Sequence, residues 1–262
     1  MTRYGFVMLT AARQQWVYRA ELGMRAVQTA LFMSIFVALW STAFGLSGQA
    51  ELEGFSLAEM VWYLAMTETI ALSSARVFIE ISEDVKAGNL AYTLARPLSY
   101  TWYQVANSLG NSAPRFVINL LTAAAVVGLS SRQIVGSPTS LLAFLGLATS
   151  ALLLDALIAV LIGLLAFWIE EVLPAFWIYQ KLLFTVGGLF LPLELFPDWL
   201  RRIAQWLPFQ FITYAPARAF VAFEPDFVLR TAGGQLAYIA VLGGLMALVW
   251  SRAQRRLVVH GG

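Results

Sequence analysis

The stretch EDVKAGNLAYTLARPLSYTWYQ (residues 83–104) places two acids, a lysine, a glycine and an Arg-Pro step between long apolar segments. The chain around it is strongly apolar, because hydrophobic residues make up 60% of its 262 residues and charged residues only 12%. Such a composition leaves too little polar surface to cover the apolar runs in water. We therefore predict an all-α integral membrane protein, and the quoted stretch is a polar turn between two of its spans.

Outward from this stretch, the chain divides into apolar segments that match the length needed to cross a bilayer, about 20 residues. We predict six transmembrane helices, at residues 25–46, 57–79, 101–130, 140–168, 172–191 and 235–250. The first apolar run, Ala26 to Gly45, is too long for a secretory signal core and is expected to remain as an anchor. Residues 1–262 are thus predicted to form a single transmembrane domain.

The basic residues indicate the orientation of these spans. Those near the span ends gather on one predicted side: Arg3, Arg13, Arg19, Arg25, Arg76, Lys86, Arg96, Arg115, Arg252, Arg255 and Arg256. The loop after the first span carries three acids and no basic residue. Lysine and arginine near span ends are retained in the cytoplasm. We therefore predict a multi-pass protein of the cell (inner) membrane with both termini cytoplasmic.

The quoted stretch then belongs to a cytoplasmic loop, residues 80–100, between the second and third spans. Ser82 can cap a helix whose first turn carries Glu83 and Asp84, where acids favour the positive end of the helix dipole. Gly88 can end that helix in a left-handed conformation. These features predict a short helix that projects from the membrane.

A second helical turn is expected directly after the first. Asn89 can cap it, and Pro97 would end it at Arg96, because the residue before a proline is pushed out of helical geometry. A compact loop of this kind can serve as a docking surface, or it can be an ordinary interfacial loop with no partner. Composition alone leaves both interpretations open.

Two further amphipathic segments are expected at the membrane surfaces. Residues 1–24 mix aromatic and basic side chains, as is typical of a helix that lies on the inner leaflet. Residues 197–208, PDWLRRIAQWLP, place Trp199, Ile203 and Trp206 on one helical face. Prolines and glycines interrupt the apolar sequence around it, so residues 191–234 are predicted to form an extracytoplasmic re-entrant hairpin between spans five and six.

This order of elements resembles a type-2 ATP-binding-cassette export permease, in particular the short six-span permeases. The resemblance rests on the surface helix before the first span, the segment AGNLAYTLARPLSYTWYQ and the segment LPLELFPDWLRRIAQWLP. It implies a permease that works as a dimer, with a second copy or with a related permease, and that couples to a separate ABC ATPase subunit. That partner would hold the ATP and magnesium, and this chain would bind no cofactor.

The resemblance also implies roles for particular residues. The coupling surface against the ATPase would comprise Glu83, Asp84, Val85, Lys86, Ala87, Gly88, Asn89, Leu90, Arg96 and Pro97. The outer gate would comprise Pro192, Glu194, Phe196, Pro197, Trp199 and Trp206.

The sequence contains no enzymatic motif of its own. It has no GxxxxGK[ST] phosphate-binding loop, and its two lysines, Lys86 and Lys181, lie in unrelated contexts. It has no cysteine, and the single histidine, His260, is next to the end of the chain. We therefore predict a transport subunit rather than an enzyme, with no metal site. The basic residues follow membrane topology and do not form a nucleic-acid patch.

Polar residues recur every three or four positions along the third span. They share one helical face: Gln104, Ser108, Asn111, Arg115, Asn119 and Thr122. A stripe of this length does not face lipid. It either packs against neighbouring polar helices or lines a substrate pathway.

Three ionisable residues lie deep in the predicted spans: Glu68, Asp155 and Lys181. Each costs about 2.5–3.5 kcal/mol near the bilayer centre, so each is expected to face the protein interior, where it either has a structural role or lines the substrate pathway with the polar stripe. Asp155 and Lys181 fall at similar depths on adjacent helices, which predicts an ion pair. Arg76 and Glu80 are also placed to pair, one helical turn apart.

Two classes of transporter therefore remain open. The first is the ATP-driven permease, and the alternative is a proton-coupled secondary transporter that uses Glu68 and Asp155. A lipid-modifying enzyme has little support, because no histidine or cysteine cluster, HExxH or GxSxG is present.

Overall fold

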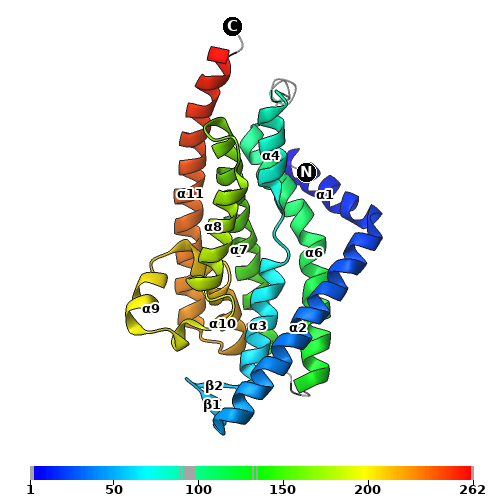
Figure 1. Cartoon of the computed structure of the whole chain (residues 1–262), viewed down its shortest axis with the longest axis vertical. Helices are drawn as coiled ribbons and strands as arrows, with labels where there is room; N and C mark the ends of the chain where they lie inside the picture. The colour runs from blue at the N-terminus through cyan, green and yellow to red at the C-terminus, as the bar shows by residue number, and fades with distance from the viewer. Residues whose placement is uncertain (1–2, 89, 91–97, 132, 134, 261–262) are drawn as a thin grey trace.

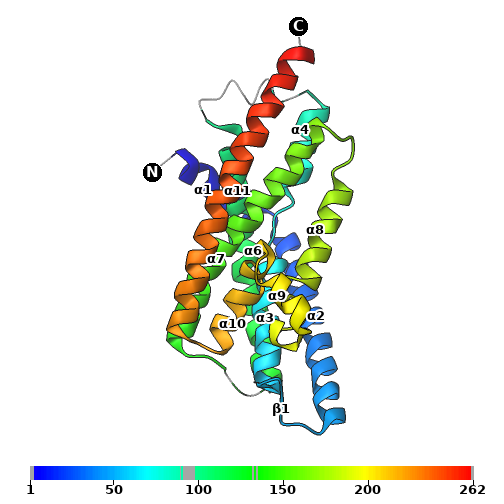
Figure 2. The ribbon, with the colours of Figure 1, turned by 90° about the vertical axis from the view of Figure 1, so that its left-hand side faces the viewer.

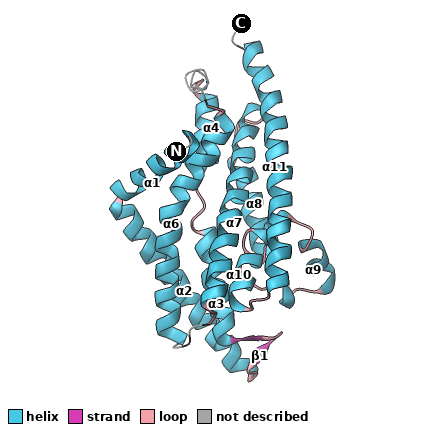
Figure 3. Cartoon of the chain, turned by 180° about the vertical axis from the view of Figure 1, so that it is seen from behind, coloured by secondary structure: helices cyan, strands magenta, loops and turns pink. Residues whose placement is uncertain are grey.

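The computed structural model describes residues 3–88, 90, 98–131, 133 and 135–260. Long helices run side by side along the molecule, and the strands in the described part of the chain form one small hairpin (Figures 1 and 3). Four helical segments are long and apolar enough to cross a membrane: Ala20–Ser47, Tyr100–Ser131, Pro138–Phe167 and Pro225–Arg256. The predicted all-α membrane class is confirmed.

Four of the six predicted spans coincide with these long helices. They correspond to α2 (Arg19–Ser47), α6 (Tyr100–Ser131), α7 (Pro138–Leu164, extended by a 3-10 turn over Leu165–Phe167) and α11 (Pro225–His260). Helix α11 is much longer than the predicted 235–250, since polar residues at both of its ends continue the helix. The N-terminal surface helix is α1 (Arg3–Val17), which lies at an angle to the long helices in Figure 1.

The other two predicted spans are not single long helices. Residues 57–79 were expected to be continuous, but α3 (Leu57–Ala71) ends and α4 (Val77–Lys86) begins only after a non-helical link. The fifth predicted span, 172–191, is helical only over α8 (Leu173–Thr185). Its last residues instead begin a non-helical segment that contains Gly187 and Gly188.

Local sequence signals explain several helix starts. Helix α3 follows strands β1 (Glu51–Leu52) and β2 (Phe55–Ser56), and Ser56 forms a reciprocal capping box with Glu59. Gly54, at the turn of this hairpin, has φ +82°, which glycine adopts without steric cost. Ser137 and Ser140 cap α7 in the same reciprocal way. These pairs satisfy backbone N–H groups that have no partner inside the helix.

The segment between α8 and α11 is a chain of short helices. It contains 3-10 turns at Leu193–Leu195 and Pro208–Phe211 and the helices α9 (Asp198–Ala204) and α10 (Tyr214–Val221). The predicted segment 191–234 is too long, because residues 225–234 already belong to α11. The amphipathic helix predicted at 197–208 is α9, which ends at Ala204, so Trp206 lies beyond it.

Both ends of the chain lie in the same half of the molecule as α4, with the C-terminus at its extreme end, and the β-hairpin lies at the opposite end (Figures 1 and 2). Contacts at the first end agree: the Lys86 Nζ is 2.7 Å from the Glu171 Oε1, and Arg256 donates to the Phe167 carbonyl at 3.2 Å. The tip of α4, the turn between α7 and α8 and the end of α11 thus form one surface, which we call the α4-tip surface.

Two glycines allow close helix packing near this surface. A Cβ at Gly110 of α6 would lie 2.4 Å from the Met8 carbonyl oxygen of α1. A Cβ at Gly163 of α7 would lie 2.8 Å from the Ile81 side chain of α4. Because no side chain fits in either place, α1 approaches α6, and α4 approaches α7, at a distance that only glycine permits.

Candidate functional site: a polar cavity beside the helix break

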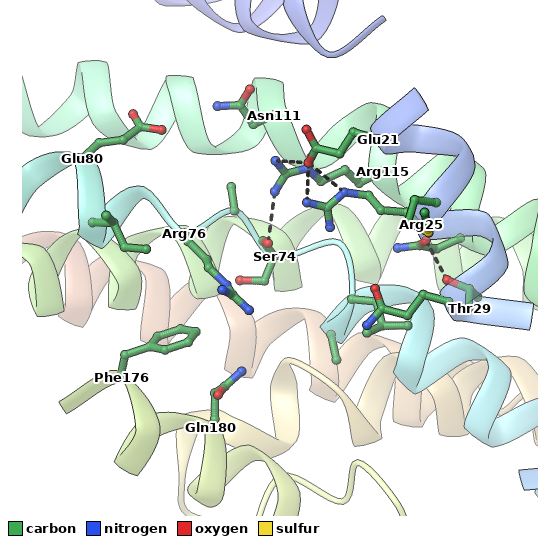
Figure 4. Close-up of a pocket in the computed structure, with 17 residues that line it drawn as sticks. Glu21, Arg25, Thr29, Ser74, Arg76, Glu80, Asn111, Arg115, Phe176 and Gln180 are labelled. Atoms are coloured by element: carbon green, nitrogen blue, oxygen red, sulfur yellow. Dashed lines mark hydrogen bonds and ion pairs between the residues drawn. The ribbon is translucent and has the colours of Figure 1, made fainter. Parts of the chain in front are cut away.

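A cavity of about 590 Å³ lies between α2, the link from α3 to α4, α6 and α8 (Figure 4). Polar and charged side chains supply most of its wall: Glu21, Arg25, Gln28 and Thr29 from α2, Ser74, Arg76 and Glu80 from the link and α4, Asn111, Arg115 and Asn119 from α6, and Gln180 from α8. Its volume is typical of sites that bind small molecules. The cavity brings together segments that are far apart in the sequence.

The link from α3 to α4 would expose backbone polar groups inside the helical bundle if nothing covered them. Asn119 donates to the Ser73 hydroxyl at 3.0 Å, and Thr29 donates to the Asn119 side-chain oxygen at 2.9 Å. The Arg115 guanidinium reaches the Ser74 carbonyl at 3.5 Å. Irregular backbone is tolerated inside a membrane protein only when protein groups or water satisfy it. Arg115 of α6 covers one backbone carbonyl of the link in this way, and the bonds from Thr29 and Asn119 hold the Ser73 side chain beside it.

The charged side chains on the α2 wall are paired with one another. Glu21 accepts from Arg25 at 2.7 Å and lies 3.9 Å from the Arg115 guanidinium. Gln15 of α1 accepts from Arg115 at 3.3 Å and donates to Asn111 at 3.1 Å. The surface helix α1 is therefore tied to the same polar network as the cavity wall.

Part of the polar stripe predicted on the third span lines the cavity, and part of it packs against neighbouring helices. Asn111, Arg115 and Asn119 line the cavity, whereas Gln104 and Ser108 are buried by packing and do not line it. The Gln104 side-chain oxygen is buried without a hydrogen-bond partner in the described structure. The stripe thus packs near the start of α6 and faces open space further along it.

The predicted ion pair between Asp155 and Lys181 is wrong. Asp155 is buried and accepts hydrogen bonds from the Ser74 hydroxyl and from the Tyr179 hydroxyl, both at 2.6 Å. Lys181 is exposed, with its ammonium 5.5 Å from the centre of the Phe184 ring. The two helices are adjacent as expected, but α8 is rotated so that Tyr179, and not Lys181, faces Asp155.

The predicted pair of Arg76 and Glu80 is also wrong. Glu80 accepts from Asn107 of α6 at 2.9 Å, while Arg76 lies at the start of α4 and extends into the cavity toward α8 (Figure 4). Arg76 precedes the first full turn of α4, so the one-turn spacing that would pair the two side chains on a continuous helix does not apply.

Glu68, the remaining deep acid, is buried in α3, with 3% of its surface exposed. It does not line the cavity in the described part of the chain, and neither do Asp155 and Lys181. Four predicted pathway residues, Gln104, Ser108, Glu68 and Asp155, are therefore enclosed by packing. The proton-coupled alternative that used Glu68 and Asp155 gains no support from this arrangement.

The predicted coupling residues lie mostly on or beside the tip of α4. Glu83, Lys86, Ala87 and Gly88 are exposed. Gly88 has φ +70°, which confirms the predicted left-handed stop. The helix, however, begins at Val77, so Ser82 is buried inside it and does not cap it, and Glu83 lies in its second half.

Other members of the predicted coupling set are less accessible. Asp84 and Val85 are half-buried, and Asp84 accepts from the Tyr100 hydroxyl at 3.0 Å. Leu90 is buried, with 1% of its surface exposed. Asn89, Arg96 and Pro97, together with the predicted second turn, lie outside the described residues.

The predicted gate residues fall into a buried and an exposed group. Glu194, half-buried, accepts from the Tyr214 hydroxyl at 2.7 Å and from Arg218 at 3.1 Å. Burial and the neighbouring Glu194 carboxylate raise the pKa of the Tyr214 phenol above its usual range, so Tyr214 remains a donor. Pro192 is also buried. These contacts anchor the segment to α10.

The remaining gate residues are exposed, apart from Phe196, which packs against the main hydrophobic core. Trp199 and Trp206 are 64% and 82% exposed, Pro197 is exposed, and Phe196 is half-buried. None of the six predicted gate residues lines the cavity described above. Within the described residues, no group of three or more histidine, cysteine or acidic side chains could hold a metal ion.

Sequence reasoning missed the helix break and the contribution of α2 and α8 to the cavity. The link contains neither glycine nor proline, the residues that usually indicate an interruption. The signal was the Ser73–Ser74 pair followed by Arg76, since adjacent hydroxyls and a charge are unusual in a continuous span. Glu21, Gln28 and Gln180 carried no recognisable motif.

The molecule is thus a helical integral membrane protein with a charged cavity and with an exposed helix tip in the half of the molecule that holds both termini. The family model of the ABC-2 family transporter proteins matches residues 26–261, and the chain belongs to this family. It is therefore a multi-pass membrane protein and the permease type of ABC transporter subunit, which generally has no catalytic role and partners with an ABC ATPase subunit. A search among curated proteins found no match to the chain.

Proposed function

We propose that this chain forms the substrate pathway of an ATP-driven exporter and that the α4-tip surface is where its ATPase partner docks. In this proposal α3 and α4 together make the second crossing, and α8 with the residues after it makes the fifth. The tip of α4 and both termini are cytoplasmic, and the short helices of residues 191–224 close the outer end. The permease acts as a dimer with a second copy or with a related chain.

The observation that carries the proposal is the construction of α4. It is a ten-residue helix whose tip is exposed and charged, and whose other end is directly joined to the link that lines the cavity. A force applied at Glu83 or Lys86 would therefore reach Ser74 and Arg76 through one short helix.

Packing supports transmission along this helix. The close contact of Ile81 with Gly163 ties α4 to α7, and the Lys86–Glu171 pair ties its tip to the turn before α8. Closure of the ATPase subunits against α4 would shift the link, and the cavity between α2, α6 and α8 would change its access. Such a change would give alternating access of the cavity to the two sides of the membrane.

The test is purification of the chain from its native membranes in mild detergent, followed by identification of co-purifying proteins and measurement of ATP hydrolysis. We expect a stoichiometric ATPase subunit to accompany the wild-type chain. The substitution Glu83→Lys reverses an exposed charge on the proposed docking surface, and we expect it to reduce recovery of the ATPase at least several-fold. A rim charge affects association mainly through electrostatic complementarity.

Glu51→Lys is the matched control, because it makes the same charge reversal at an exposed residue of the β-hairpin, at the opposite end of the molecule. We expect it to retain the ATPase. Equal recovery of the ATPase with both variants, or equal loss with both, would exclude the α4 tip as the docking surface. A wild-type chain that purifies without any ATPase would overturn the proposed function itself.

A further inference from the structure

We propose that the cavity binds the anionic group of an amphiphilic molecule and that Arg76 supplies the main attracting charge. The proposal deepens the proposed function, since it names the chemical class that the pathway accepts. Three features of the cavity support it: the pairing of the charges in its wall, the direction in which Arg76 extends, and the apolar surface beside Arg76.

The arginines and acids of the wall are unequally paired. Arg25 and Arg115 both approach Glu21, and the Glu80 carboxylate accepts from the Asn107 amide. Arg76 forms no ion pair or hydrogen bond with any side chain in the described part of the chain. Three arginines against two glutamates leave the cavity with an excess of positive charge, and Arg76 is the arginine of the described wall that has no carboxylate partner within salt-bridge distance.

The position of Arg76 suits a ligand better than a structural role. Its guanidinium extends from the start of α4 across the cavity toward Phe176 and Gln180 of α8 (Figure 4). A guanidinium presents several N–H donors in one plane and binds carboxylate or phosphate oxygens in pairs. Gln180 and Gln28 also line the cavity, and their side-chain amides can donate to the same anion.

The rest of the wall is apolar. Met24, Leu72, Ile79 and Phe176 line the same cavity, so a purely hydrophilic anion would leave them in contact with water. A volume of about 590 Å³ accommodates a headgroup together with the first part of an attached chain. An anionic group that carries an apolar tail matches both halves of the wall.

The test uses dodecyl phosphate as the probe and the full-length chain in dodecyl maltoside, a detergent with an alkyl chain of equal length and no charge. Native mass spectrometry gives the number of bound probe molecules and the dissociation constant. We expect one saturable site and an affinity about 10-fold weaker in Arg76→Gln, because loss of a hydrogen bond to a charged group costs roughly that factor or more.

Arg252→Gln is the control, since it removes an equal charge from an exposed arginine on α11 toward the same end of the molecule. We expect it to bind dodecyl phosphate as the wild type does. An absence of saturable binding to the wild type, an unchanged affinity in Arg76→Gln, or an equal loss in both variants would overturn the proposal.

Competition distinguishes the sources of the anionic group. Displacement of the probe by phosphatidylglycerol would support the proposal with a bilayer lipid as the ligand, and resistance to it would support an amphiphile of another kind. Displacement by inorganic phosphate at the concentration of the probe would overturn the requirement for an apolar tail. Binding of dodecyl phosphate is measured without the ATPase, so we expect Glu83→Lys to bind the probe as the wild type does. A failure of ATPase docking can therefore be distinguished from a failure of the cavity to bind the probe.

Discussion

Asp155 is a buried acid that is held by hydroxyl groups rather than by a cation. Ser74 lies in the link beside the cavity and Tyr179 lies on α8, so one carboxylate joins three elements. A carboxylate that accepts two short hydrogen bonds compensates part of the cost of its burial. The role of Asp155 is therefore to fix the position of the link and of α8 relative to α7.

We predict that Asp155→Ala lowers the free energy of unfolding by about 1–3 kcal/mol for each hydroxyl donor that it leaves unpaired. Lys181 lies on the same helix as Tyr179 but is exposed, so Lys181→Ala should change the free energy of unfolding by less than about 0.5 kcal/mol. Thermal unfolding of the purified chains, followed by tryptophan fluorescence, measures both. A loss of stability in Lys181→Ala as large as that in Asp155→Ala would contradict this account and restore the ion pair.

The burial of Asp155 and Glu68 could be predicted from the sequence, because an isolated acid in an apolar span must face protein. The partners of Asp155 could not. Whether Tyr179 or Lys181 faces it depends on the rotation of α8 by about half a turn, and rotation is set by packing with neighbouring helices rather than by the residues of α8 alone.

At the scale of elements, α1 depends on its close approach to α6. Gly110 leaves space for the backbone of α1, and Gln15 of α1 contacts Asn111, which directly follows Gly110, and Arg115 further along α6. The surface helix is thus fastened by one steric and one polar contact, and its position is linked to the cavity wall through Arg115.

We predict that Gly110→Ala destabilises the protein by about 1–3 kcal/mol, because the new methyl group overlaps the Met8 carbonyl and the backbone of α1 must shift. Gly45→Ala is the control: it makes the same change in α2 at a place with open space, where alanine is favoured in a helix. Limited trypsin digestion at the exposed Arg13 should become faster in Gly110→Ala only. Equal cleavage of both variants would show that α1 does not dock through Gly110.

The tip of α4 and the turn between α7 and α8 should be joined by a zero-length carbodiimide cross-link between Lys86 and Glu171, whose charged atoms are 2.7 Å apart. Peptide mass spectrometry detects this link. Glu171→Gln should abolish it, whereas Glu170→Gln should retain it. A link from Lys86 to Glu170 alone, or none at all, would contradict the described arrangement of the α4-tip surface.

The elements themselves were partly predictable. Hydropathy located α2, α6, α7 and α11, since long apolar runs leave few alternatives in a membrane. It did not reveal that 57–79 is broken, because the groups that stabilise the break, Asn119 and Arg115, come from another helix. For the same reason the cavity, built from four separate segments, could be predicted only along its α6 wall.

At the scale of the whole molecule, charge and shape agree on two distinct ends. The tip of α4, the end of α11 and the turn before α8 meet at one end, where most of the basic residues were predicted. The β-hairpin, with exposed Glu51 and Glu53, lies at the other. Basic residues are retained on the cytoplasmic side, which assigns the α4-tip surface to the cytoplasm in the proposed orientation.

The absence of cysteine from the sequence permits a direct test of this orientation, because each introduced cysteine is the only thiol in the chain. We predict that Ala87→Cys and Arg252→Cys, both exposed, react with a membrane-impermeant maleimide in inverted vesicles and not in intact cells. Gln49→Cys, exposed before the β-hairpin, should show the opposite pattern. The three positions are solvent-accessible, so a difference in labelling reports the side of the membrane and not burial.

Labelling of Ala87→Cys and Gln49→Cys from the same side would contradict the two-ended arrangement. A complete reversal of the pattern would keep that arrangement but place the α4 tip outside the cell, where no ATP-driven subunit could act on it.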